Sequence, residues 1–290
     1  MYTLRAVNEY GDDLTLTSCD VCEVLHVEGL NPPGASIITT KIAGTDGEVF
    51  NSSSVDMRNI VIELSLKTPI EKNRQKINRL FRSKRWVRLF YKNDTHDVYI
   101  DGYVETHEND FFTQKQKPQI SILCPSVYFK NNEDSVIEFS NTQPNFEFPF
   151  SISAEGVELG IISKLTTAVI DAGDIETGCT ITFRATGDNV VNPVFYNRTT
   201  QQYFKIDFSK AEDDSFVMQE GDIITISTNK KNKTVTYRRD DVEINAIFLM
   251  AEGSEWIQFD PYENEVSYDA DSGATNLVVT VTVTKLVEGV

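Results

Sequence analysis

The chain has 290 residues, a net charge of −17 and a hydrophobic content of 40%. That content is enough for packed cores, so wholesale disorder is excluded, and the length suits two domains of ordinary size. The acidic balance argues against general nucleic-acid binding, because most of the surface would repel phosphates. The first residues lack an apolar run, and no later run is long enough for a bilayer, so we expect neither a secretory signal nor membrane insertion.

Strand-forming segments dominate the first half of the chain. They are rich in Val, Ile, Thr, Tyr and Phe, and several alternate apolar and polar residues as half-buried strands do. The expected strands are 60–67, 86–91, 96–106 and 118–124.

One helix is expected between the first two of these strands, in the stretch TPIEKNRQKINRLFRSKRW (68–86). Thr68 can cap it, Pro69 suits the first helical position, and Glu71 stands where a capping box requires an acid. Apolar residues fall near one face, at Ile70, Ile77, Leu80 and Phe81. The window 71–92 holds nine Lys or Arg and one Glu, a local charge of +8 that leaves the rest of the chain at −25.

The second half continues the strand pattern. We expect strands at 180–186, 222–228, 233–238 and 277–286, separated by turns such as TGDN (186–189), TNKKNK (228–233) and DADSGATN (269–276). The predicted domains are 1–130 and 147–290, with a linker at 131–146. Residues 1–140 carry 16 Lys or Arg and 20 Asp or Glu, whereas residues 141–290 carry 11 Lys or Arg and 24 Asp or Glu, so the second half is the more acidic.

Catalytic and metal-binding patterns are absent from the sequence. All three histidines (His26, His96 and His107) lie in the first half, so the second half cannot house a histidine-dependent triad by itself. Cys19 and Cys22 form a CxxC motif, but a zinc site would need two further ligands, and we expect a structural role beside a strand. The loop at 269–273 lacks the Glu of a calcium loop and is expected to be a turn, with Gly273 at positive φ. We therefore predict no cofactor, no metal and no enzymatic activity.

The ordered series of segments resembles the distal tail proteins of long, non-contractile phage tails. It begins with NPPGASIITTKIAGTDGEVFNSSSVDMRNIVIELSL (31–66), the basic helix, DVYIDGYVE (97–105) and KPQISILCPSVYFK (117–130). It continues through FEFPFSIS (146–153), the segment at 177–206, EGDIITISTNKKNKTVTYR (220–238) and NEVSYDADSGATNLVVTVTV (264–283). The resemblance covers nearly the whole chain, and it also fits prophages and phage-derived tail particles.

The resemblance implies a mainly β fold and a structural role. It implies an N-terminal, β-sandwich-like, ring-forming domain with one α-helix and an extended arm, and a C-terminal galectin-like β-sandwich. Such a protein would form a homo-hexamer in the phage tail tip or baseplate of the virion, made in the cytoplasm of the bacterial host. The ring would join the tail tube protein to the tail-associated tip protein and to host-binding components such as a receptor-binding protein. The resemblance is compatible with a single hexameric ring and with a dimer of two stacked rings.

Two surfaces are candidates for binding. For the basic residues Arg79, Arg82, Lys84 and Arg85, three interpretations stay open: a solvated helix face, a contact with another subunit or with the tail tube, and a lining of the DNA channel. The alternative function is a carbohydrate-binding module that recognises the host cell wall, with Trp256 and the Tyr196, Asn197 and Arg198 loop as candidate sugar contacts. The loops at 131–145 and of the second domain are candidate adaptor surfaces.

Overall fold

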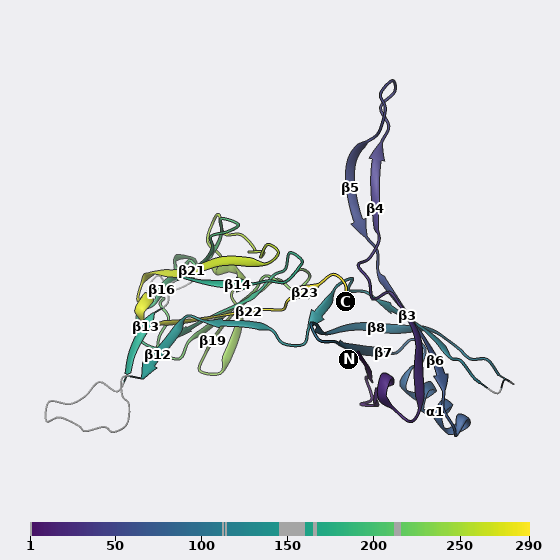
Figure 1. Cartoon of the computed structure of the whole chain (residues 1–290). Helices are drawn as coiled ribbons and strands as arrows, with labels where there is room; N and C mark the ends of the chain where they lie inside the picture. The colour runs from purple at the N-terminus through teal and green to yellow at the C-terminus, as the bar shows by residue number, and fades with distance from the viewer. Residues whose placement is uncertain (1, 112, 114, 145–159, 165–166, 212–215) are drawn as a thin grey trace. The chain divides into compact units, whose positions relative to one another are not determined.

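The computed structural model describes residues 2–111, 113, 115–144, 160–164, 167–211 and 216–290. The chain divides into two compact units: unit 1 is Met1–Asn132 with Leu286–Val290, and unit 2 is Glu133–Lys285. In the described residues β-strands dominate and α1 (Ile70–Leu80) is the one α-helix (Figure 1), which confirms the predicted mainly β class. None of the helices described is long and apolar enough to cross a membrane.

Unit 1 is built on a nine-stranded antiparallel sheet. The main path runs β2-β1-β7-β8-β9-β6-β3, and β10 joins β8 to β23 beside it. The strands are β1 (Thr3–Asn8), β2 (Asp13–Thr15), β3 (Cys22–Glu28), β6 (Arg58–Leu66), β7 (Trp86–Lys92), β8 (Asp97–Glu108), β9 (Gln119–Cys124), β10 (Phe129–Asn131) and β23 (Leu286–Val287). The four strands expected in the first half are β6 to β9, and each lies within three residues of its expected bounds.

The core of unit 1 follows from the period-two alternation of these strands. In β6, Ile60, Ile62, Leu64 and Leu66 are buried while the residues between them are more exposed. Side chains that alternate in this way stand on opposite faces of the sheet, so one face of β6 supplies a continuous apolar row. The apolar face of α1 packs into the same cluster through Ile77, Leu80 and Phe81.

Helix α1 begins differently from the prediction. Its N-cap is Pro69, in extended backbone, and no side chain caps the helix. Thr68 lies one residue too early for its hydroxyl to reach the first helical amides. Glu71 accepts hydrogen bonds from Arg74 and Gln75 instead of reaching back to the cap. The predicted capping box is therefore wrong, although the helix and its buried face are confirmed.

Two strands leave the sheet of unit 1 as a hairpin. β4 (Ala35–Thr40) and β5 (Val49–Val55) pair only with each other, with a register shift between Ile38 and Thr39. The hairpin extends away from the rest of unit 1 (Figure 1), as the predicted arm should. Gly29, which follows β3, has φ of +84°, and a Cβ there would lie 2.1 Å from the Asn59 carbonyl oxygen, so only glycine fits this exit.

The C-terminal residues return to unit 1. β23 pairs with β10 through Val287 and Leu286. Arg58, only 4% exposed, donates to the carbonyl of Glu288 at 2.6 Å and to the carbonyls of Val127 and Asn31. Its guanidinium also lies 4.7 Å from the ring centroid of Phe129. One buried cation thus ties the end of the chain to three other segments of unit 1.

Unit 2 contains two larger sheets and one two-stranded pair. The six-stranded sheet has the order β11-β22-β15-β18-β19-β20, the four-stranded sheet has the order β14-β21-β16-β17, and β12 pairs with β13. The strands are β11 (Ser135–Glu138), β12 (Ser140–Pro144), β13 (Gly160–Lys164), β14 (Thr167–Asp171), β15 (Thr180–Ala185), β16 (Val191–Asn197), β17 (Gln202–Lys205), β18 (Ile223–Ser227), β19 (Thr234–Arg239), β20 (Val242–Asn245), β21 (Glu263–Ser272) and β22 (Leu277–Val283). The four strands expected in the second half are β15, β18, β19 and β22.

The core of unit 2 draws side chains from both larger sheets. Phe183 of the six-stranded sheet and Phe195 of the four-stranded sheet belong to one buried cluster. Phe139, next to β11, packs its ring edge to face against Phe195 and Tyr268. Two sheets that bury one shared core form a β-sandwich.

One predicted turn and the predicted linker are shorter in the structure than the sequence indicated. The expected turn at 269–276 is shorter, because β21 continues to Ser272, and Gly273 then takes φ of +71° as predicted. The segment 131–146, expected as a linker, contains β11 and β12, and β11 completes the six-stranded sheet by pairing with β22. Residues 145 and 146 lie outside the described part of the chain.

Candidate interaction surfaces

The basic candidates surround the C-terminal end of α1. The helix ends at Leu80, where the Phe81 N–H donates to the Ile77 carbonyl at 2.9 Å. Arg79 lies in the last turn of the helix, whereas Arg82, Lys84 and Arg85 follow it in the connection to β7. The prediction of one continuous basic helix is wrong for these three residues. Lys84 takes φ of +66°, so the chain turns there and cannot continue the helix.

Three of the four basic candidates contact the turn between β1 and β2 of the same chain. Arg79 pairs with Asp12 at 3.4 Å, and Arg85 pairs with Glu9 at 3.3 Å. The guanidinium of Arg82 lies 5.3 Å from the ring centroid of Tyr10. The structure therefore brings these arginines together on an acidic and aromatic turn, which we call the β1–β2 clasp. Sequence reasoning missed it, and the available signal was the acidic cluster around Gly11.

Other cations of this region have no carboxylate partner in the part of the chain that the structure describes. Lys72, Lys76 and Lys84 are exposed, and no ion pair involves them. Lys76 and Arg79 also line a groove of about 310 Å³ whose other walls include Asp12 and Leu14. The three lysines are thus exposed cations without an ion pair, whereas Arg79 and Arg85 are exposed cations that pair within the chain.

The β4–β5 hairpin is an exposed apolar surface. Every residue from 35 to 54 is exposed, including Ile37 at 65% and Phe50 at 61%. The register pairs Ile37 with Ser53 and Thr39 with Phe50, which places Ile37 and Phe50 on one face of the hairpin. Large apolar side chains on a projecting two-stranded element are unusual for a free surface, so the hairpin is a candidate interaction surface.

The candidate sugar contacts do not form one site. Asn197 is fully buried, where it donates to the Gln258 carbonyl and accepts from the amides of Thr199 and Thr200. Trp256 packs against the buried ring of Phe204 at 5.4 Å, toward the core of unit 2. Asn197 is thus withdrawn from the surface, whereas Trp256 is half-buried with its ring against the core.

Tyr196 and Arg198 lie on the opposite face of the four-stranded sheet. Tyr196 is half-buried beside Tyr203, with ring centroids 6.2 Å apart, and Arg198 donates from Nε to Ser267 at 2.9 Å. The two tyrosines share a face because Tyr196 and Tyr203 are register partners. Of the four predicted residues, only these two therefore share an accessible surface.

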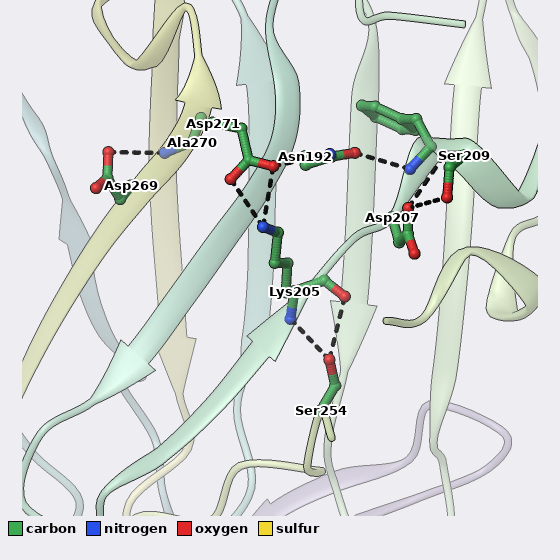
Figure 2. Close-up of polar contacts among 9 residues, drawn as sticks. Asn192, Lys205, Asp207, Ser209, Ser254, Asp269, Ala270 and Asp271 are labelled. Atoms are coloured by element: carbon green, nitrogen blue, oxygen red, sulfur yellow. Dashed lines mark hydrogen bonds and ion pairs between the residues drawn. The ribbon is translucent and has the colours of Figure 1, made fainter. Parts of the chain in front are cut away.

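A network of polar side chains lies on the four-stranded sheet around Lys205 and Asp271 (Figure 2). Lys205 Nζ donates to Asp271 at 2.7 Å, Asn192 donates to the same carboxylate at 2.9 Å, and Asn192 accepts from the Phe208 amide. Ser254 bonds both the amide and the carbonyl of Lys205. The pKa of Asp271 is lowered by the hydrogen bonds from Lys205 and Asn192. Because the groups satisfy one another, the network is structural and ties β17 and β21 together.

The histidines and cysteines are dispersed or locally satisfied. His26 is exposed and lies 3.5 Å from Glu28, whereas His107 contacts the Phe81 carbonyl through Nδ1. Burial lowers the pKa of His107, so it is neutral at neutral pH. Cys19 and Cys22 lie side by side as free thiols. No group of three metal-ligating side chains occurs among the residues described.

Comparison with known proteins finds a family match within the first unit. Residues 22–124 match the family model described as the phage tail protein RIFT-related domain. This part of the chain is therefore similar to the domain that the family model describes. The match covers β3 to β9, which includes the arm, α1 and most of the sheet of unit 1. No curated protein matches the chain.

Two sets of solved structures share the fold of the entire chain. The Dit protein of phage SPP1, a hub of the adsorption apparatus in phages that infect Gram-positive bacteria, is 12% identical with a TM-score of 0.66 over 99% of both chains. A chain of the phage P2 baseplate in its activated conformation with Ca is 10% identical with a TM-score of 0.53 over 100% of both chains. The predicted resemblance to siphophage distal tail proteins is confirmed by the domain match and by this shared fold.

Proposed function

We propose that this protein is a structural hub of a phage tail tip, in which six copies close a ring. The ring joins the tail tube protein to the tail-associated tip protein and to host-binding components, and the protein resides in the virion without enzymatic activity. The phage tail domain and the shared fold support a hub role. The observation that carries the proposal of a ring is the exposed apolar arm.

The arm needs a partner for physical reasons. An isolated two-stranded hairpin is marginally stable in water, because it buries too little apolar surface to offset the ordering of its backbone. Ile37 and Phe50 would each contribute about 1.5–3 kcal/mol on full burial. A neighbouring copy can bury them through a heterologous contact, and such contacts generate a ring when the rotation closes. Closure then makes the last contact effectively intramolecular, which strengthens the assembly.

Charge supports a contact between unlike surfaces. Unit 2 carries 26 Asp or Glu and 11 Lys or Arg. Unit 1 is close to neutral, with 18 Asp or Glu and 16 Lys or Arg. We propose that Lys84, with Lys72 and Lys76, faces an acidic surface of a neighbouring copy or tail protein, and that Arg79, Arg82 and Arg85 hold the β1–β2 clasp behind it. A channel lining is disfavoured, because dense cations would hold DNA phosphates and slow their passage.

The first experiment measures the solution mass by light scattering after size exclusion, at low and high salt. A mass near six or twelve times 32.8 kDa supports one ring or two. The double variant Ile37→Ser, Phe50→Ser should lower that mass, while Val242→Ser, which removes an equally exposed valine from β20, should not. A wild-type monomer at every concentration and salt would contradict self-assembly. An unchanged mass of the arm variant would contradict the role of the arm.

A charge swap separates the clasp from a partner contact. Arg85→Glu alone should lower both the unfolding free energy and the extent of assembly. Arg85→Glu combined with Glu9→Arg restores the intramolecular ion pair with its charges reversed. If Arg85 acts only within the clasp, the swap restores both unfolding free energy and assembly. Restored stability with impaired assembly would assign Arg85 to an intermolecular contact. The double variant Arg82→Glu, Arg85→Glu should weaken assembly, because it disrupts the clasp next to Lys84, and unchanged assembly would contradict a role of these arginines in assembly.

The carbohydrate-binding alternative has a direct test. A glycan array with the wild-type protein and with Tyr196→Ala should be silent if unit 2 serves only as a scaffold. A signal that Tyr196→Ala removes would support sugar binding on the Tyr196 and Arg198 face.

A further inference from the structure

Two thiols meet where the chain enters β3. The Sγ atoms of Cys19 and Cys22 lie 3.6 Å apart. Cys19 is half-buried and Cys22 is buried, so solvent reaches the pair through Cys19. The other cysteines, Cys124 and Cys179, are fully buried, and their thiols contact Ile122 and Thr228 instead of another cysteine. The first pair is therefore the one pair of adjacent thiols in the described chain.

The turn that holds this pair is fixed from outside. The Lys67 amide donates to the Val21 carbonyl at 3.0 Å, and Lys67 Nζ donates to the Cys19 carbonyl at 2.8 Å. Asn73, buried on α1, donates to the Asp20 carbonyl at 3.2 Å. These bonds order the backbone around the two thiols, and a disulfide would shorten the distance between the two sulfur atoms from 3.6 Å to about 2.05 Å.

We propose that Cys19 and Cys22 close an intramolecular disulfide when the protein passes from the reducing cytoplasm to an oxidising medium, with a small-molecule disulfide as the oxidant. The change of compartment rests on the proposed function in a released virion, whereas the thiol chemistry does not. Disulfides persist in oxidising surroundings and are rare in the reducing cytoplasm. We therefore expect the two thiols to stay reduced during assembly and to oxidise after release of the particle.

The reaction balances as thiol–disulfide exchange. The Cys19 thiolate attacks one sulfur of the oxidant, and the other half of the oxidant leaves as a thiolate. The Cys22 sulfur then attacks the Cys19 sulfur of the mixed disulfide and releases the second half. Two protein thiols are oxidised, one oxidant disulfide is reduced to two thiols, and the two protons pass to the released thiolates.

The order of the steps follows from exposure and charge. Cys19 is the sulfur that an oxidant can reach, and Cys22 can only react from within the fold. Burial raises the pKa of the Cys22 thiol, so the closing step should accelerate as the pH rises. The product would covalently join Cys19, which directly follows η1 (Leu16–Ser18), to the first residue of β3. Since β3 is an edge strand and leads to the arm, the bond would secure that edge in the released particle.

The test uses the full-length protein equilibrated with reduced and oxidised glutathione, then denatured, alkylated and weighed by mass spectrometry. In the oxidised sample we expect two alkyl groups per chain instead of four, a Cys19–Cys22 peptide in the map, and a melting temperature a few degrees higher. Cys19→Ser should take three groups in both buffers and show no oxidation-dependent shift in melting temperature.

Three results would overturn the proposal: four alkyl groups at the most oxidising ratio, a disulfide-linked dimer, or a stable glutathione adduct on Cys19. Ring formation is measured by light scattering on portions of the equilibrated samples that are taken before denaturation. A monomer that still closes the disulfide would contradict the proposed ring and leave the thiol chemistry in place, so the two failures are distinguishable.

Discussion

At the scale of single residues, unit 2 contains a buried carboxylate with an ionic partner, Asp222 with Arg239. Asp222 is 2% exposed and accepts from Arg239 at 2.6 Å, from Tyr237 at 2.8 Å and from the Gln219 amide at 2.7 Å. Burial by itself would raise the pKa of Asp222, but these hydrogen bonds outweigh it and lower the pKa below its ordinary value. The charged carboxylate is thus the form that the folded unit 2 prefers.

Removing the cation from this contact should destabilise unit 2. Arg239→Ala leaves a buried carboxylate without its ionic partner, and we expect a loss of about 2–3 kcal/mol, below that of a fully buried pair because Arg239 is partly exposed. The matched control is Arg238→Ala, the exposed neighbour in the same strand. Urea unfolding measures both, and equal stability of the two variants would contradict the assignment.

The same carboxylate predicts an acid dependence. A folded-state pKa below the unfolded value means that Asp222 contributes stability above the unfolded pKa of about 3.9 and loses it as the pH falls through the folded value. The stability difference between wild type and Asp222→Asn should therefore be largest near neutral pH and should shrink below about pH 4. Urea midpoints at a series of pH values measure it, and a difference that widens in acid would refute the sign.

At the scale of elements, helix α1 depends on its buried side and on one buried amide. Asn73 is 4% exposed and donates to the carbonyls of Asp20 and Lys67. These bonds anchor the helix to the turn before β3 and to the end of β6. The cations Lys72, Lys76 and Arg79 lie on the exposed face of the helix, away from this anchor.

A substitution pair on one helix tests this anchor. Asn73→Ala leaves two carbonyls without their donor and should cost about 1–2 kcal/mol, despite the better helix propensity of alanine. Asn78→Ala, on the exposed face of the same helix, should be neutral or slightly stabilising. Circular dichroism during urea unfolding compares them, and a neutral Asn73→Ala would show that the anchor contributes nothing measurable.

At the scale of the whole molecule, the chain closes unit 1 with residues from its far end. Unit 2 is inserted between β10 and β23, which are paired neighbours in unit 1. The Val290 amide also donates to the Leu30 carbonyl at 3.0 Å, close to the segment that leads to the arm. The C-terminal residues therefore contribute directly to the packing of unit 1.

Deleting Leu286–Val290 tests this closure. The deletion removes β23 and the Glu288 acceptor of Arg58, and we expect unit 1 to lose on the order of 2–3 kcal/mol. Deleting only residues 289 and 290 keeps β23 and that acceptor and should have a smaller effect. Hydrogen exchange of β8 and β10 peptides reports the change, and unaltered protection after the larger deletion would contradict the closure.

The sequence alone determined the strands β6 to β9, β15, β18, β19 and β22, the helix and its buried face, and the resemblance to distal tail proteins. Alternation and helical periodicity are local, and an apolar row in one strand or on one helix face can be read without knowing its partner. The tertiary structure decided what depends on distant residues. The pairing of β23 with β10, the β1–β2 clasp around Arg79, Arg82 and Arg85, and the burial of Asn197 all join segments far apart in the chain. Spacing in one sequence does not encode which distant carboxylate meets a cation or which side of a loop faces the core, because the packing of the whole unit sets both.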